Sequence, residues 1–249
     1  MPDVKLSQLA AASAASVAAG AGLWTMAGHI LGLRMEYVGP ASIRVSSGSA
    51  WIPSLQQAIE VPAALSLSGL TLAASTWYHL YLYLNGSTPA IEAVTAAPAA
   101  PYSGTARAKT SDNTRRYIGS FRTNASGQIL KFSQSGNAVT YLEDTNAAPF
   151  LVLAGGTAST ATSVSAAAVA PPTATSIKAT VLNASTNAYV RLSNSDGPNA
   201  ATGYITVAAP GGVTVTEIPL NSSQAYTYAY DAAPNSSTFQ RVFGYAYER

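Results

Sequence analysis

Tyrosines at alternating positions are the residues of this sequence best suited to form a binding surface. The segment 225–231 places Tyr226, Tyr228 and Tyr230 on one face of an expected strand, because side chains alternate across a strand. The expected last strand repeats the pattern and ends near Tyr247. A tyrosine ring packs on a sugar or a protein while its hydroxyl forms a hydrogen bond. We therefore predict Tyr226, Tyr228, Tyr230 and Tyr247 as ligand-binding residues; the alternative for each is burial in the core or in a subunit interface.

The residues needed for catalysis or metal binding are sparse. A glycosidase needs two carboxylates about 5 to 10 Å apart in one cleft. The 11 acidic residues are dispersed, and the one tight pair, Glu143 and Asp144, falls in an expected linker. Two distant histidines, His29 and His79, and no cysteine do not make a common zinc site, and no nucleophile-elbow sequence lies near either histidine. We expect no enzymatic activity, no catalytic residue, no metal and no cofactor, and we assign His79 a buried structural role.

Positive charge is concentrated in residues 107–131. The basic residues there are Arg107, Lys109, Arg115, Arg116, Arg122 and Lys131, against Asp112 alone. Such a cluster can contact nucleic acid, lipopolysaccharide phosphate or an acidic protein. Turns separate these residues and no aromatic stacking platform accompanies them, so a solvated face is the favoured interpretation and no nucleic-acid partner is expected.

The strand expected over 77–84 has two apolar faces. One face carries Leu80, Leu82 and Leu84, and we expect it to line the domain core. The other face carries Trp77, Tyr81 and Tyr83 and must meet either a second layer or a neighbouring subunit. We predict these three aromatic residues at a subunit interface.

The elements that position these residues are expected to be strands. Only 10% of the residues are charged, which is too few for the charged faces of long amphipathic helices. Because 48% are hydrophobic, the chain has enough apolar residues to form a packed core. Short strand patterns separated by turn residues favour antiparallel meanders and sandwiches. The turn-forming residues 144–149 indicate a domain boundary. We predict a β-rich domain over 28–148 and a C-terminal β-sandwich or jelly-roll domain over 149–249.

Residues 1–27 differ from the rest. Leu6, Leu9 and small residues follow a 3-4 spacing that predicts a short Ala-rich helical segment, with a frayed leader as the alternative. The segment is too short and too polar to span a bilayer, so no membrane insertion is expected.

Several segments together resemble a known protein family. They are Trp77-Tyr-His-Leu-Tyr81, Ile91-Glu92, Tyr102-Ser-Gly-Thr-Ala-Arg-Ala-Lys109 and Thr114-Arg-Arg-Tyr-Ile-Gly-Ser-Phe-Arg-Thr-Asn-Ala-Ser-Gly-Gln-Ile-Leu-Lys-Phe132. They resemble tail-fibre and receptor-binding proteins of tailed bacteriophages, over roughly residues 40–142. The later half, with Ala170-Pro-Pro-Thr173 and Phe243-Gly-Tyr-Ala-Tyr-Glu-Arg249, is similar to the β-sandwich tips of such fibres.

The resemblance implies a homotrimeric, non-enzymatic virion protein of the phage tail, assembled in the host cytoplasm. Its N-terminal segment, 1–27, would dock to other tail or baseplate proteins, and its C-terminal domain would bind a bacterial surface glycan or protein receptor. Two other functions stay open at this point. One is a head fibre, collar or adaptor protein with a structural role only; the other is a capsule depolymerase, which the lack of paired acids disfavours.

Overall fold

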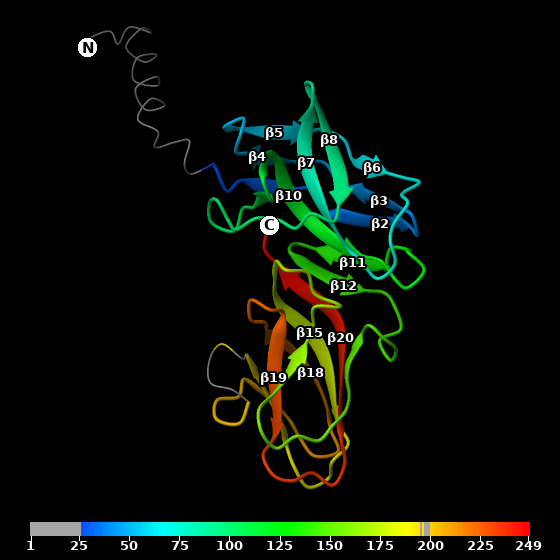
Figure 1. Cartoon of the computed structure of the whole chain (residues 1–249), viewed down its shortest axis with the longest axis vertical. Helices are drawn as coiled ribbons and strands as arrows, with labels where there is room; N and C mark the ends of the chain where they lie inside the picture. Colours follow the sequence, from blue (N-terminus) through cyan, green and yellow to red (C-terminus); the bar gives the residue numbers. More distant parts are fainter. Residues whose placement is uncertain (1–25, 195, 197–199) are drawn as a thin grey trace, which may run out of the picture.

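The computed structural model describes residues 26–194, 196 and 200–249, and its regular structure is β throughout (Figure 1). Its twenty strands form five antiparallel sheets, and the described residues contain no α-helix. For the described residues, the predicted mainly β, antiparallel fold class is thus confirmed. The predicted helical segment, 1–27, lies almost wholly outside the described residues.

The N-terminal lobe contains three small sheets. Its strands are β1 (Ile30–Gly32), β2 (Met35–Gly39), β3 (Ser42–Val45), β4 (Gly48–Ile52), β5 (Gln57–Val61), β6 (Leu65–Leu67), β7 (Trp77–Asn85), β8 (Thr88–Val94), β9 (Ala108–Lys109) and β10 (Asp112–Arg122). The strand orders are β1-β4-β5, β2-β3-β6 and β8-β7-β10-β9. The predicted hairpin between β7 and β8 is present, and Gly86 supplies the positive φ of 64° that its turn requires.

The C-terminal lobe contains two sheets, of six and four strands. Its strands are β11 (Phe132–Ser135), β12 (Ala138–Tyr141), β13 (Leu151–Gly156), β14 (Thr162–Ser165), β15 (Ala174–Asn183), β16 (Val190–Asn194), β17 (Thr206–Ala208), β18 (Val213–Pro219), β19 (Ala225–Tyr230) and β20 (Thr238–Tyr247). One sheet has the order β11-β12-β20-β15-β18, with β13 paired to β20, and the other has the order β14-β19-β16-β17. Tyr226 on β19 bonds to Gln240 on β20, and Tyr230 bonds to Asn183 on β15, so the two sheets face each other.

The expected division near residue 148 does not coincide with a division between sheets. β11 and β12 precede that point, yet β12 pairs with β20, with Val139 opposite Tyr245 and Thr140 opposite Gly244. Gly244 permits this approach, because a Cβ there would lie 2.4 Å from the carbonyl oxygen of Val139. The sheet of the C-terminal lobe therefore extends through the expected boundary.

An aromatic cluster joins the two lobes. The rings of Tyr245 on β20 and Trp77 on β7 meet edge to face at 6.1 Å. The Tyr245 hydroxyl donates to the carbonyl of Ser120 at 2.9 Å, and Tyr117 and Thr173 share a hydroxyl hydrogen bond of 2.8 Å. The buried apolar residues of both lobes form one continuous core. The lobes are therefore held together by burial and by hydrogen bonds that have little contact with water.

His79 is buried in this core, as predicted. Its Nδ1 lies 2.7 Å from the Ser120 hydroxyl, and burial lowers its pKa to about 4. The neutral imidazole is therefore the form that the folded state accommodates.

We expect acid to destabilise the protein partly through His79. Because the pKa is lower in the folded chain than the ordinary value of 6.5, the unfolded chain binds the extra proton first. The contribution of neutral His79 is complete above about pH 6.5 and is lost as the pH falls to about 4, a loss of about 3 kcal/mol. Urea unfolding of the wild type and of His79→Gln at both ends of this range checks it. An equal acid-induced loss in the two proteins would contradict the assignment to His79.

Candidate binding site

The tyrosine row predicted to bind a ligand lies inside the protein. Tyr226, Tyr228, Tyr230 and Tyr247 are each at most 3% exposed. The sequence pattern placed the first three on one strand face correctly, but that face points at the opposite sheet. The prediction that these four residues contact a ligand is wrong for the folded chain, and the alternative of core residues applies.

The hydroxyls of these tyrosines are occupied by partners within the chain. Tyr226 bonds to Gln240, Tyr230 donates to Asn183 at 3.1 Å, and Tyr228 accepts from the Ala158 amide at 3.3 Å. Tyr247 donates to the carbonyl of Ile118 at 3.3 Å. Buried phenols need such partners, and burial raises the pKa of Tyr230 to about 12.

The three aromatic residues predicted at a subunit interface differ in how far they are buried within the chain. Tyr81 is fully buried and donates to the carbonyl of Ala96 at 2.7 Å, so its part of the prediction is wrong. Trp77 is half-buried, and its Nε1 donates to the carbonyl of Ala167 in the C-terminal lobe at 2.9 Å. Tyr83 is also half-buried and lies under the guanidinium of Arg115 at 3.9 Å. For Trp77 and Tyr83 the interface stays a prediction.

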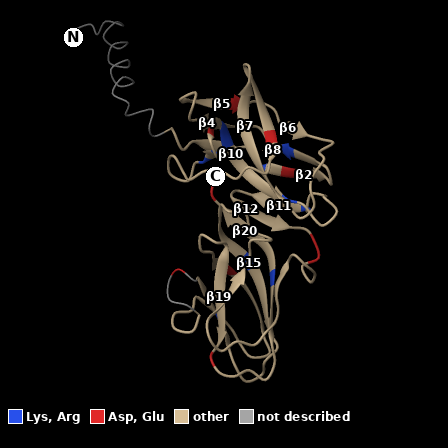
Figure 2. Cartoon of the chain, in the orientation of Figure 1, with Lys and Arg blue, Asp and Glu red and all other residues tan. Residues whose placement is uncertain are grey.

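The basic residues of 107–131 do not form one basic surface. Arg107 pairs with Glu248 at 3.0 Å, Lys109 and Arg115 both pair with Glu92, and Arg116 is fully buried. Figure 2 shows basic and acidic segments interspersed over the N-terminal lobe. Three of the six basic residues are therefore paired with carboxylates within the chain and a fourth is buried, where we had expected a solvated face.

A shallow site on the C-terminal lobe exposes two other tyrosines. It has a volume of about 270 Å³ and is lined by Tyr189, Arg191, Tyr204, Val207 and Asp231, and we name it the Tyr189–Tyr204 site. Tyr189 and Tyr204 are 47% and 49% exposed, in contrast to the buried tyrosine row. Two half-exposed aromatic rings beside charged groups are typical of binding surfaces.

Strand alternation explains why Arg191, the basic residue of this site, faces outward. Val190 and Leu192 on β16 are buried against the core, so Arg191 between them faces outward, opposite Val207 of β17. Its guanidinium carbon lies 4.8 Å from the centroid of the Tyr204 ring, a cation–π distance. Asp231 lies 3.5 Å from Arg191, so the pair is weak and both groups keep hydrogen-bonding capacity for a ligand.

Backbone contacts fix the other half of the site. Asp231 accepts a hydrogen bond from the Tyr189 amide at 2.9 Å, and its own amide donates to the Tyr189 carbonyl at 3.1 Å. In the neighbouring loops the Asn235 side-chain oxygen Oδ1 accepts from the Ser185 hydroxyl and the Thr186 amide at 3.0 and 2.9 Å. The loop that carries Tyr189 is therefore preorganised, which lowers the entropic cost of binding.

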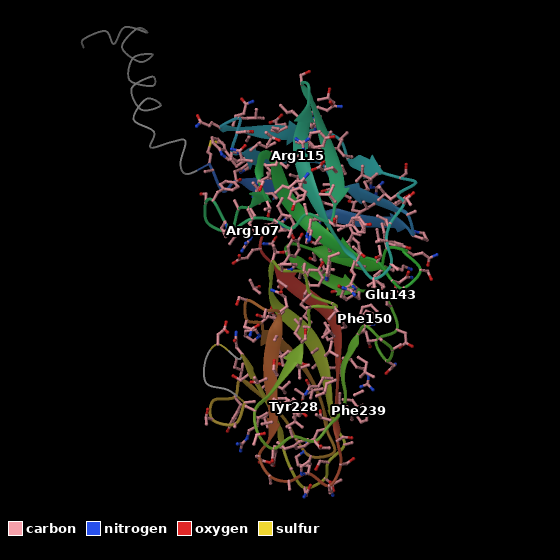
Figure 3. The ribbon with its side chains drawn as sticks, viewed as in Figure 1. Arg107, Arg115, Glu143, Phe150, Tyr228 and Phe239 are labelled. Atoms are coloured by element: carbon pink, nitrogen blue, oxygen red, sulfur yellow. The ribbon has the colours of Figure 1, made fainter. Side chains whose placement is uncertain are left out.

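The C-terminal lobe also has an apolar face on its larger sheet. Leu182 on β15 lies opposite Val213 on β18 and Phe239 on β20, so the three side chains form one row across the sheet. Val213 and Val215 are 62% and 68% exposed. We call Leu182, Val213, Val215 and Phe239 the apolar sheet face; Figure 3 shows Phe239 at the side of the lobe. β18 is an edge strand of its sheet, and exposed apolar edges favour association with another chain.

The described residues contain neither a cluster of metal-ligating side chains nor a long apolar helix. Across 26–194, 196 and 200–249, no three His, Cys, Asp or Glu side chains lie close enough together to hold a metal ion. Over the same ranges, no helix has the length and apolar character needed to cross a membrane.

The alternating tyrosine pattern did not identify Tyr189 and Tyr204, although the turn residues that precede each of them indicate exposure. Tyr189 follows Ser185-Thr-Asn-Ala, and Tyr204 follows Ala201-Thr-Gly. A single aromatic residue in a turn-rich segment has no apolar partners at strand spacing, so exposure is its simplest interpretation. Regular rows of tyrosine, by contrast, belong to strands that are packed.

Comparison with known proteins does not extend this picture. No protein-family model matches the chain, and a search of curated proteins finds no similar sequence.

Proposed function

We propose that this protein is a non-enzymatic bacteriophage virion protein, a trimeric tail fibre or receptor-binding protein that attaches the particle to the bacterial surface. The observation that carries the proposal is the preorganised Tyr189–Tyr204 site on the C-terminal lobe. The resemblance of residues 40–142 to phage tail fibres supports the same function.

A surface glycan is the receptor class that suits this site best. The apolar face of a sugar ring packs on an exposed tyrosine ring, as on Tyr189 or Tyr204, while sugar hydroxyls bond to charged donors and acceptors such as Arg191 and Asp231. A hollow of about 270 Å³ accommodates little more than one sugar unit. Each contact is therefore weak, and a fibre needs several copies of the site, which raise the avidity by roughly 10² to 10⁴.

The apolar sheet face is the surface through which we propose that three copies associate. Exposed valines on β18 beside Leu182 and Phe239 are costly to leave in water. On the same face Lys178 lies opposite Glu217, so the surface carries both signs of charge and is compatible with itself. Within this proposal the N-terminal segment attaches the trimer to the tail.

Removal of the two exposed tyrosines tests receptor binding. We expect the full-length double variant Tyr189→Ala, Tyr204→Ala to bind host cells or their purified lipopolysaccharide at least roughly 10-fold more weakly than the wild type, because both packing surfaces for the sugar are lost. Both side chains are about half exposed, so folding should be retained. The measurement is binding of labelled protein to a panel of bacterial strains and their purified surface polysaccharides.

The matched control is Tyr102→Ala, which removes a tyrosine of 36% exposure from the N-terminal lobe. It should bind as the wild type does. Equal loss in the control, or full binding by the double variant, would reject the Tyr189–Tyr204 site. If the wild type binds no surface in the panel, the protein is better described as a head fibre, collar or adaptor protein.

A further inference from the structure

A second hollow lies at the junction of the two lobes, far along the sequence from the Tyr189–Tyr204 site. It has a volume of about 430 Å³. Three segments line it: the loop before β7, the end of β10 with the turn that follows it, and the connection from β12 to β13. Its lining includes the side chains of Ser75, Arg122, Ser126, Leu130, Glu143, Asp144 and Phe150. We call this hollow the junction cleft; Figure 3 shows Glu143 and Phe150 close together beside the junction.

Arg122 is the unusual group in this cleft. It is half-buried, and its Nε has no hydrogen-bond partner among the described residues. Its guanidinium carbon lies 5.7 Å from the centroid of the Trp77 ring, which fixes its position without using its N–H groups. Burial lowers the pKa of Arg122, and no carboxylate of the described residues forms an ion pair with it that would offset the desolvation. A ligand carboxylate in the cleft would pair with the two terminal guanidinium nitrogens, which are not among the buried unpartnered atoms, in a bidentate geometry that a guanidinium favours.

The other wall of the cleft supplies acceptors. Glu143 accepts the Lys131 amide through one oxygen at 2.6 Å, and Asp144 accepts from Asn146 through one oxygen at 2.9 Å. These bonds hold the carboxylates in place and leave the second oxygen of each for another donor. Ligand hydroxyls are suitable donors, and the hydroxyls of Ser75 and Ser126 add further capacity at the rim.

The cleft is held by its own backbone and has an apolar floor. The Asn124 side-chain oxygen accepts from the amides of Ser126 and Gln128 at 2.9 and 3.0 Å, and the Ser75 amide donates to the Asn124 carbonyl at 2.8 Å. Phe150, only 3% exposed, and Leu130 form the floor. The site is therefore preformed, as small-molecule sites usually are.

We propose that the junction cleft binds a sugar that carries a carboxylate, such as a uronic or sialic acid. The carboxylate pairs with Arg122, the sugar hydroxyls donate to Glu143 and Asp144, and the apolar ring face packs towards Phe150. This site is separate from the Tyr189–Tyr204 site, and the proposal stands whether or not that site binds a receptor.

The test is binding of free monosaccharides to the full-length protein, measured by saturation-transfer NMR. The probes are glucuronate, galacturonate and N-acetylneuraminate, each compared with its neutral counterpart. We expect saturable binding of at least one acid in the millimolar range, at least roughly 10-fold tighter than its neutral counterpart, as one charge-assisted pair requires. Arg122→Met should abolish the preference for the acid, and Arg122→Lys, which keeps the charge but not the planar fork, should retain part of it.

Arg44→Met is the matched control, because it removes an arginine of β3 whose side chain is 51% exposed and which lines neither site. It should bind the acidic sugars as the wild type does. Loss of binding in Arg191→Met, which removes the arginine of the other site, but not in Arg122→Met would assign the binding to the Tyr189–Tyr204 site and overturn the proposal. Failure of all three acids to bind saturably, or binding that Arg122→Met and Arg122→Lys leave unchanged, would overturn it as well.

Discussion

Replacing Tyr245 with alanine is expected to lower the free energy of unfolding by about 4 kcal/mol, as for other large aromatic residues in cores. Tyr245 is 1% exposed and touches Trp77 of the other lobe, so truncation leaves a cavity at the junction. It also leaves the Ser120 carbonyl without the donor that now lies at 2.9 Å. Chemical unfolding followed by tryptophan fluorescence measures the change, and Trp77 reports on the junction directly.

Tyr245→Phe separates the two contributions. It keeps the ring and removes only the hydroxyl, so we expect a loss of about 1 to 2 kcal/mol. If alanine and phenylalanine cost the same, ring packing contributes little and the two lobes are not joined by this cluster. If Tyr245→Ala costs less than about 1 kcal/mol, the junction is not part of the cooperative core.

Replacing Val215 with aspartate is expected to convert the proposed trimer into single chains. Val215 lies opposite Thr180, one row from Val213, Leu182 and Phe239, so a charge there would be taken out of water in the assembly, which is strongly unfavourable. In the single chain Val215 is 68% exposed, so the substitution should leave the fold intact. Light scattering at micromolar concentration should give about three times 25.5 kDa for the wild type and 25.5 kDa for Val215→Asp.

Val38→Asp is the matched control, because Val38 is 56% exposed but lies on β2 of the N-terminal lobe. It should keep the mass of the wild type. A wild-type mass of one chain would refute the trimer itself. A trimer that survives Val215→Asp would show that copies meet elsewhere, and the half-buried Trp77 and Tyr83 would then be the residues to replace.

Several features of this protein follow from its sequence alone. A charge content of 10% leaves too few charged residues to cover long helices, which predicts a mainly β chain. Asn85-Gly86 predicts a tight turn, because glycine adopts the positive φ that the turn needs. A lone histidine in an apolar strand predicts burial, and His79 is buried. Each of these depends on local conformation or on composition, which the neighbouring residues largely decide.

Other features were decided by the tertiary structure. Alternation groups Tyr226, Tyr228 and Tyr230 on one strand face. Neither face of this strand carries charged residues, so the sequence does not tell whether the tyrosines meet water or the core. Packing against β15 and β20 buries them. The pairing of β12 with β20, about a hundred residues later, carries one sheet across the boundary expected near residue 148, and this pairing is visible only in the tertiary structure. The junction cleft likewise assembles Ser75, Arg122 and Glu143 from segments distant in the chain. Such contacts depend on long-range complementarity of surfaces, and no local pattern of residues encodes that complementarity.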